Sequence, residues 1–224
     1  RTVSGSEAEE LKKLLKEKNI HFSVEEDLIG EMWEDRPELS CEPVMELEMK
    51  WTGETRASKI ARIRQQMKEE GADIFILTSL DDIAWLLNIR GNDIHCCPVV
   101  LSYLIMTEKE VKLFAGEKAF PEKVRRNLEA DSVRIYPYNE VYTYAQKIDK
   151  DQNVLISEKC VNSRLVSSIP ENVTILDRPN PTLLAKAVKN PVEMENERTA
   201  HIKDGVAVTK FIHWLKTKVG DERI

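Results

Sequence analysis

The segment from Ala72 to Thr78 restricts the fold more than any other, because it is an almost continuous apolar run. Such a run is typical of a strand that is buried on both faces. A helical pattern begins near Glu54, and Gly71 suits the position just after its end. Ser79 is placed to cap a second helix over residues 81–88. The apolar positions of the first helix are Ile60, Ile63 and Met67. A buried strand between two helices predicts an α/β fold.

The rest of the chain continues this alternation. Residues 98–106 and 111–115 are predicted to form a hairpin, because a polar turn at residues 107–110 separates them. Asn180 followed by Pro181 combines an N-cap with a proline at the first helical position, which predicts a helix start. Further strands are predicted at 133–136, 153–157 and 173–177, and further helices at 121–130, 139–148 and 161–169. A hairpin beside strands that are joined through helices predicts a mixed sheet with flanking helices.

The first fifty residues have a pattern of their own. Ser6 and Glu9 have the spacing of a capping box, and a strand is predicted from Ile20 to Val24. Asp27 is placed to cap a second helix, and the segment from Arg36 to Gly53 is predicted to be a linker. This unit lacks the strands against which it would pack, so we expect it to belong to another domain.

A long helix is predicted from Asn190 to about Val219. Asn190 and Pro191 repeat the N-cap and proline signal, and Glu193 stands at the third helical position. The apolar side is expected to carry Ile202, Val206, Ile212, Leu215 and Val219. No later element covers this side, so we expect the helix to open a further domain. With apolar faces uncovered at both ends, we expect the chain either to form a homodimer or to fray at these ends.

Composition narrows the class of protein. The 224 residues carry 33 Lys and Arg against 39 Asp and Glu, a formal net charge of −6. This acidic balance argues against general nucleic-acid binding, which needs a positive field. No apolar run approaches the roughly 18 residues of a membrane span, and no secretory signal is recognised at the start. The four cysteines show no C-x-x-C spacing, so reduced thiols in a cytoplasmic protein are expected.

The most suggestive segment for chemistry is the loop from Asn88 to Asp93, in which Gly91 is flanked by a cation, an amide and an acid. Loops at the ends of strands and helices often carry function. The forked donors of Arg90 can hold a carboxylate or a backbone carbonyl of a peptide. The alternative is an ion pair between Arg90 and Asp93 that stiffens the turn.

Two other clusters have simpler explanations. His95, Cys96 and Cys97 could supply a thiolate nucleophile beside an imidazole. Adjacent side chains usually point apart, so a buried cysteine and a solvated histidine are expected instead. Asp81 and Asp82 could be a carboxylate pair for acid–base work, but negative charge at a helix N-terminus explains them more simply.

A third cluster lies on the long helix. Glu197, His201 and Asp204 share one helix face, so a metal could in principle be held there. Such spacings are more often plain neighbours along a helix. We therefore predict no metal site in this chain.

Three stretches resemble one known family. The stretch from Ser79 to Asp93 (SLDDIAWLLNIRGND), with Pro98-Val99-Val100 and Ser102-Tyr103 after it, resembles the middle domain of the three-domain Xaa-Pro aminopeptidases (aminopeptidase P). Residues 56–64 are similar to the helix that opens that domain. Residues 187–207 are similar to the junction with the catalytic domain and its first helix, which in this family has the pita-bread fold. The resemblance extends over nearly the whole chain.

The resemblance implies a creatinase/aminopeptidase P N-terminal-like α/β domain, with a mixed sheet and flanking helices. It divides the chain into three parts. Residues 1–52 would be the tail of a first creatinase-like domain plus a linker, residues 53–189 the middle creatinase-like domain, and residues 190–224 the first helix of a catalytic domain.

The resemblance also implies an activity for the whole enzyme. The family uses two divalent metal ions, usually manganese, to remove an N-terminal residue from peptides with proline at the second position. The family's metal ligands belong to the region after the last helix, so this chain is expected to be non-catalytic and to shape substrate access. Arg90, Asn92, Asp93 and His95 are the expected cleft-facing residues. The alternatives are a free-standing α/β binding module or pseudo-enzyme, and a thiol enzyme that uses Cys96 or Cys97.

Overall fold

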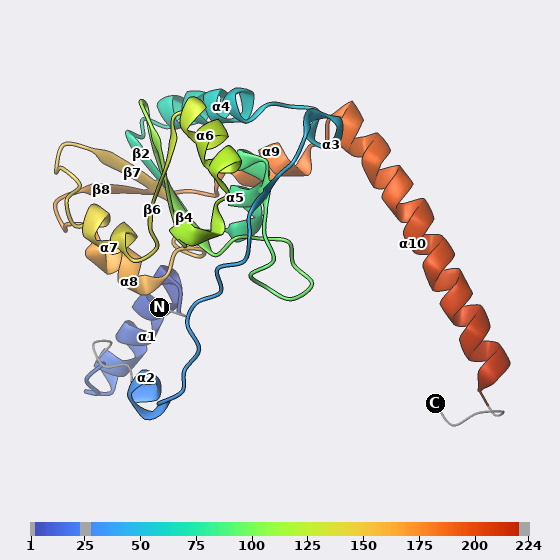
Figure 1. The fold of residues 1–224 in the computed structure, drawn as a ribbon. Coiled ribbons are helices and arrows are strands. Elements are labelled where there is room, and N and C mark those ends of the chain that lie inside the picture. Colours follow the sequence, from blue (N-terminus) through green and yellow to red (C-terminus); the bar gives the residue numbers. More distant parts are fainter. Residues whose placement is uncertain (1–2, 23–27, 220–224) are drawn as a thin grey trace.

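The computed structural model describes residues 3–22 and 28–219. Over these ranges the chain forms a six-stranded sheet in the order β6-β5-β4-β2-β7-β8, with helices on both faces (Figure 1). The strands are β2 (Ile74–Leu77), β4 (Ser102–Thr107), β5 (Val111–Ala115), β6 (Val133–Pro137), β7 (Asn153–Ile156) and β8 (Thr174–Asp177). The surrounding helices are α4 (Arg56–Glu69), α5 (Leu80–Leu87), α6 (Glu122–Ala130), α7 (Glu140–Ala145), α8 (Ser163–Ser168) and α9 (Pro181–Ala187), with a 3-10 helix at Glu117–Ala119. The α/β fold with a mixed sheet and flanking helices is confirmed.

The strand β2 lies inside the sheet, as its apolar sequence predicts, and all of its side chains are buried. It pairs antiparallel with β4, where Ile74 stands opposite Thr107, and parallel with β7, where Ile74 stands opposite Val154. The strands β4 and β5 form the predicted hairpin, whereas the β5–β6 and β7–β8 pairs are parallel. The carboxyl ends of β2, β7 and β8 therefore meet at one edge of the sheet.

Alternate side chains of β2 enter two apolar cores. Phe75 and Leu77 belong to the core that also contains side chains of α4, α5, α6 and α9. Ile74 and Ile76 belong to the core formed with α7 and α8. The helices α5 and α8, which follow the neighbouring strands β2 and β7, thus lie on opposite faces of the sheet.

The helix α1 (Gly5–Glu17) begins two residues earlier than predicted, and the assignment of Ser6 and Glu9 to its capping box was wrong. Ser4 is the N-cap: its hydroxyl accepts from the backbone N–H of Glu7, and its own N–H donates to the Glu7 carboxylate at 3.0 Å. The chain contains the same spacing twice. The earlier one is used because the N–H of Gly5 donates to the carbonyl of Val161 at 2.9 Å, which holds this end of α1 beside α8.

The predicted strand from Ile20 to Val24 is not formed over residues 20–22, and its last two residues lie outside the described ranges, as does the predicted cap Asp27. The N–H of Ile20 instead turns back to the carbonyl of Leu15 at 2.9 Å. The short helix α2 (Leu28–Met32) follows.

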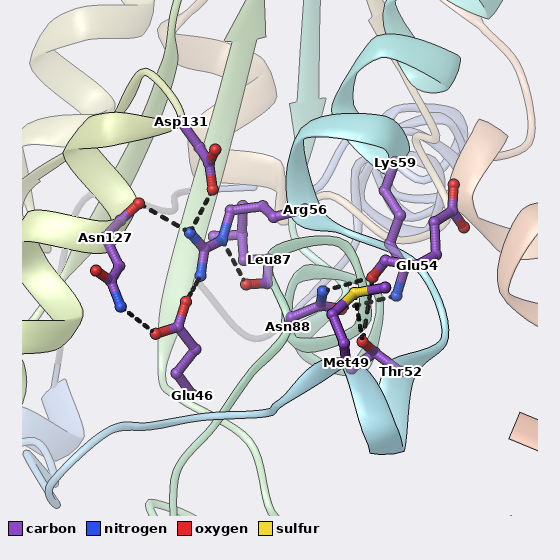
Figure 2. Close-up of polar contacts among 10 residues, drawn as sticks. All are labelled: Glu46, Met49, Thr52, Glu54, Arg56, Lys59, Leu87, Asn88, Asn127 and Asp131. Atoms are coloured by element: carbon purple, nitrogen blue, oxygen red, sulfur yellow. Dashed lines mark hydrogen bonds and ion pairs between the residues drawn. The ribbon is translucent and has the colours of Figure 1, made fainter. Parts of the chain in front are cut away.

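The segment predicted to be a linker contains two short elements that tie it to the domain. The strand β1 (Met45–Glu46) pairs antiparallel with β3 (Ile89–Arg90), and the helix α3 (Met49–Thr52) ends at Gly53. Figure 2 shows Glu46 reaching Arg56 and Asn127, so a charged side chain of the linker is anchored between α4 and α6. Sequence reasoning missed these elements because they are shorter than any periodic pattern.

Several boundaries also differ from prediction. The first strand of the hairpin begins at Ser102 rather than Pro98, because the N–H of Leu101 donates to the Asp93 carboxylate at 2.8 Å instead of joining the ladder. The helix α8 begins after Asn162, whose side chain accepts from the N–H of Leu165 at 3.0 Å.

The helix α10 (Pro191–Lys218) extends away from the sheet (Figure 1). The predicted capping box is formed: the Asn190 side chain accepts from the N–H of Glu193, and the Glu193 carboxylate accepts from the N–H of Asn190. No side chain of α10 is buried among the described residues. Apolar side chains such as Ile202 (69% exposed) and Val206 are therefore open to solvent.

Candidate functional site

A cavity of about 400 Å³ lies where the linker, the helices α4 and α5, and the start of α10 come together. Its lining includes Trp51, Lys59, Trp85, Arg90, Lys189 and Glu193. Concave sites that combine aromatic walls with a few charged groups are the usual places for small ligands and peptide ends. The cavity is therefore the candidate site.

Lys59 is the most deeply buried charged group of this site, at 1% exposure. Its ammonium donates to the carbonyl of Trp85 at 3.0 Å and to Oδ1 of Asn88 at 2.8 Å, and it lies 4.4 Å from the centroid of the Trp85 ring. Asn88 adopts a left-handed conformation at the end of α5, and its amide also donates to the carbonyl of Glu54 (Figure 2). A short helix end thus positions the acceptor that holds the buried cation.

The indole N–H of Trp85 is buried, and no group among the described residues accepts its hydrogen bond. Buried polar groups normally have partners, so an unpaired donor beside a cavity suits a ligand that brings an acceptor. Lys59 and Arg90 line the same cavity and supply positive charge. The site is therefore suited to a carboxylate or a peptide carbonyl.

Burial lowers the pKa of Lys59 from 10.5 to about 8. The carboxylates of Glu193 and Glu54 act in the opposite direction, and the cations of Arg90 and Arg62 act in the same direction as burial. Burial is the largest of these causes, so the ammonium is held at a cost that the two carboxylates only partly offset.

This shift predicts a pH dependence of stability. Between about pH 8 and 10.5 the unfolded chain still holds the Lys59 proton while the folded chain has released it. Unfolding then takes up a proton, so the free energy of unfolding should rise with pH in this window. In urea unfolding at a series of pH values, Lys59→Met should lack this rise. Lys68→Met, on the exposed side of the same helix, should follow the wild-type curve; identical curves for both variants would contradict the prediction.

Of the four predicted cleft residues, Arg90 lines the cavity; Cys97, Asp81 and Glu197, from the other clusters, line it as well. Its guanidinium donates to the carbonyls of Ala84 at 3.0 Å and of Ile89 at 2.8 Å. Burial lowers the pKa of Arg90, and the carboxylate of Glu193 acts against this. Arg90 and Asp93 have separate partners, so the ion pair considered as an alternative is not formed.

The other predicted residues lie on the loop that follows β3, outside the cavity lining. Asp93 is a structural anchor, because its carboxylate accepts from the hydroxyl of Ser40 at 2.7 Å and from the N–H groups of Glu42 and Leu101. Asn92 and His95 are exposed. The structure therefore does not bring the four residues together, and their position in a substrate cleft stays a prediction.

The remaining clusters are also placed by the structure. Cys96 and Cys97 are both exposed, so the expectation of a buried cysteine there is wrong. Glu197 and His201 approach to 3.9 Å on the exposed helix α10. Across residues 3–22 and 28–219 no three His, Cys, Asp or Glu side chains are grouped so that they could hold a metal ion.

Asp81 and Asp82 lie in the first turn of α5, as predicted, and they also anchor α9. The side-chain cap predicted from Ser79 is not formed, although Ser79 is the N-cap residue. The ammonium of Lys186 pairs with both carboxylates, and the hydroxyl of Thr182 donates to Asp82 at 2.8 Å. Burial alone would raise the pKa of Asp81, but hydrogen bonding and charge from Lys186 leave it lowered. These carboxylates are engaged in ion pairs, which is the role of structural groups.

Sequence reasoning missed Lys59, Trp85 and Glu193 as site residues. Lys59 stands four residues before Ile63, in the apolar stripe of α4, and a charged residue at such a position was the available signal. Trp85 looked like an ordinary core residue, and Glu193 like a capping residue only. Their convergence depends on the packing of α4, α5 and α10, which no local pattern encodes.

Comparison with known proteins shows the family to which this chain is related. Residues 35–193 match the family model of the creatinase/prolidase N-terminal domain. The chain is 33% identical over 228 residues to Xaa-Pro aminopeptidase 1 of Dictyostelium discoideum, and this alignment covers 98% of this chain and 36% of that protein. It is 34% identical over 203 residues to the Caenorhabditis elegans Xaa-Pro aminopeptidase app-1, covering 88% and 33%. The chain thus spans about a third of the length of these relatives.

The structure agrees with that of a solved relative over nearly the whole length of this chain. The crystal structure of X-prolyl aminopeptidase from C. elegans, a cytosolic enzyme with a di-nuclear active site, superposes on 96% of this chain and 36% of that chain, with a TM-score of 0.87 and 32% identity. In the ranges that the structure describes, no helix is both long and apolar enough to cross a membrane. The family match extends over most of the chain and agrees with the observed fold, so the chain belongs to the creatinase/prolidase N-terminal domain family.

Proposed function

We propose that this chain is a non-catalytic part of a metal-dependent Xaa-Pro aminopeptidase. The whole enzyme would remove an N-terminal residue from peptides that have proline at the second position. The observation that carries this proposal is the agreement with the C. elegans X-prolyl aminopeptidase, in which 96% of this chain corresponds to 36% of that one. We also propose a cytoplasmic location, which is supported by the description of that C. elegans enzyme as cytosolic.

The metal chemistry is assigned to polypeptide outside this chain. The described residues supply no group of three ligands, and the pair of Glu197 and His201 is exposed on α10. These residues do not fit the two divalent ions, manganese in our proposal, that such an enzyme would use. We therefore assign no step of the reaction to residues of this chain.

The proposed role of this part is to shape access of peptides to the catalytic part. The cavity beside the start of α10 offers Arg90 and the Trp85 indole N–H to a carboxylate or carbonyl of a bound peptide. The loop with Asn92, Asp93 and His95 would form the outer part of this wall. We retain the proposed division into residues 1–52, 53–189 and 190–224. We also propose that the exposed apolar side chains of α10, which are spread around the helix, support a homodimer.

The proposal predicts that the 224-residue chain, supplied with manganese, leaves a peptide such as alanyl-prolyl-alanine intact. Liquid chromatography of the peptide after incubation would measure this, with the C. elegans enzyme as the positive control. Release of alanine that a chelator abolishes would overturn the proposal. The coding sequence past Ile224 provides a second check: a stop codon there would favour a free-standing binding module or pseudo-enzyme.

A further inference from the structure

A second cavity lies at the edge of the sheet where the parallel strands β2, β7 and β8 end. The chain leaves β2 toward α5 on one face of the sheet and leaves β7 toward α8 on the other. Where neighbouring parallel strands connect to opposite faces, the two departing segments diverge and leave a crevice outside the carboxyl ends. Open α/β sheets bind ligands at this type of position.

The crevice has a volume of about 440 Å³, which is enough for a small molecule. It is lined by residues that directly follow each of the three strands. Ser79 follows β2, Ser157 and Lys159 follow β7, and Arg178 and Asn180 follow β8.

A buried polar side chain of this lining has one atom without a protein partner. Asn180 is 8% exposed; its amide nitrogen donates to the Ser79 hydroxyl at 3.2 Å, and its amide oxygen has no partner among the described residues. Ser157 is also 8% exposed and lines the same crevice. Buried polar groups are normally satisfied, so the unpartnered oxygen of Asn180 indicates a ligand with a hydrogen-bond donor.

Charges of both signs surround these groups. Asp177 ends β8 at the crevice, and together with burial it raises the pKa of the neighbouring Glu158 carboxyl, which marks a locally negative region. Lys159 and Arg178 also line the crevice and supply positive charge, and the contact of Arg178 with the exposed carboxylate of Glu70 is long, at 3.9 Å. Lys186 is already engaged by Asp81 and Asp82, so it adds no free charge.

We infer that this crevice binds a small zwitterion, a free α-amino acid or a dipeptide. The ammonium group would donate to the amide oxygen of Asn180 and face Asp177, while the carboxylate would face Lys159 and Arg178. Charge-assisted hydrogen bonds of this kind are stronger than neutral ones, so both charged ends of the ligand are required. The inference concerns the sheet edge alone and does not depend on the peptidase assignment.

The test is an NMR titration of the ¹⁵N-labelled 224-residue chain with L-alanine and with L-alanyl-L-alanine, which distinguishes the two zwitterions. At least one should give saturable shifts at the amides of Ser157, Lys159 and Asn180. N-acetyl-L-alanine lacks the ammonium and L-alaninamide lacks the carboxylate, so each should bind about tenfold more weakly than L-alanine. If the dipeptide is the ligand, N-acetylated and C-amidated alanyl-alanine should likewise bind about tenfold more weakly than L-alanyl-L-alanine. Equal binding of a blocked form, or no saturable shift at these amides, would overturn the inference.

A matched pair of variants checks the location. Lys159→Met should weaken binding of the zwitterion about tenfold, because the ligand carboxylate loses a cationic partner. Lys150→Met changes another exposed lysine, just before β7 at the opposite end of the strand, and should bind like the wild type. Circular dichroism spectra would verify that both variants are folded. Equal losses in the two variants would overturn the inference.

Discussion

Replacing Arg56 by methionine should lower the free energy of unfolding by about 3–5 kcal/mol. The side chain of Arg56 is 3% exposed, and its guanidinium donates to the carbonyls of Leu87 at 2.7 Å and Asn127 at 3.1 Å (Figure 2). It also pairs with the carboxylates of Asp131, at 2.8 Å, and of Glu46. Methionine keeps much of the volume, but it leaves two partly buried carboxylates without their cation.

The position of Arg56 explains why the expected loss is large. Leu87 is the last residue of α5, and Asn127 and Asp131 lie at the end of α6, so one cation serves the carbonyl ends of two helices. Helix C-termini carry partial negative charge, which favours a cation there. Glu46 adds the linker to the same cluster. Loss of Arg56 should therefore loosen the linker, α5 and α6 together.

Urea unfolding followed by circular dichroism would measure this loss. Arg126→Met is the control, because Arg126 is exposed on α6 and its contact with Glu122 is long, at 3.6 Å. Exposed pairs contribute little, so this variant should stay within about 0.5 kcal/mol of the wild type. Arg56→Lys keeps the charge but not the fork of donors, and should fall between the wild type and Arg56→Met. A loss below about 1 kcal/mol for Arg56→Met would show that the cluster does not stabilise the fold.

The regular part of this fold could be predicted from sequence because its signals are local. The run from Ala72 to Thr78 alone requires a strand with cover on both faces, and the turn at residues 107–110 fixes the hairpin next to it. Asn190 and Glu193 are close enough in sequence to form a recognisable cap. Each of these patterns has its physical cause within a few residues.

The linker and the candidate site could not be predicted in the same way. Arg56 and Asp131 are 75 residues apart, and nothing in either local sequence indicates that they meet. Lys59 meets Trp85 and Asn88 only after α4 packs on α5. Arg90 was predicted as a site residue because it lies in a loop that contains glycine and charged residues. In the structure it belongs to β3, whose pairing with β1 positions it at the cavity. Both strands are too short to show a sequence pattern.

The junction between the linker and α10 depends on Gly53. This residue has φ of +62°, a left-handed conformation that side chains disfavour. A Cβ here would collide with the side-chain oxygen of Asn190 and would lie 2.8 Å from Cβ of Val192. The same Asn190 oxygen caps α10, and its amide nitrogen donates to the carbonyl of Thr52 at 2.8 Å. One glycine thus leaves room for the contact that sets α10 beside α3.

Gly53→Ala should lower the free energy of unfolding by about 2–4 kcal/mol, from backbone strain together with loss of the cap. Gly71→Ala is the matched control: Gly71 has φ of +71°, but nothing lies within 4 Å of its Cβ position, so strain of about 1–2 kcal/mol is its only cost. Urea unfolding would give both values. The amides of Val192 and Glu193 donate to the Asn190 oxygen, and their hydrogen exchange should accelerate in Gly53→Ala alone. If the two variants lose equal stability and both amides stay protected, the Asn190 cap does not depend on the space at Gly53, and α10 is held to the domain by its other contacts with α3.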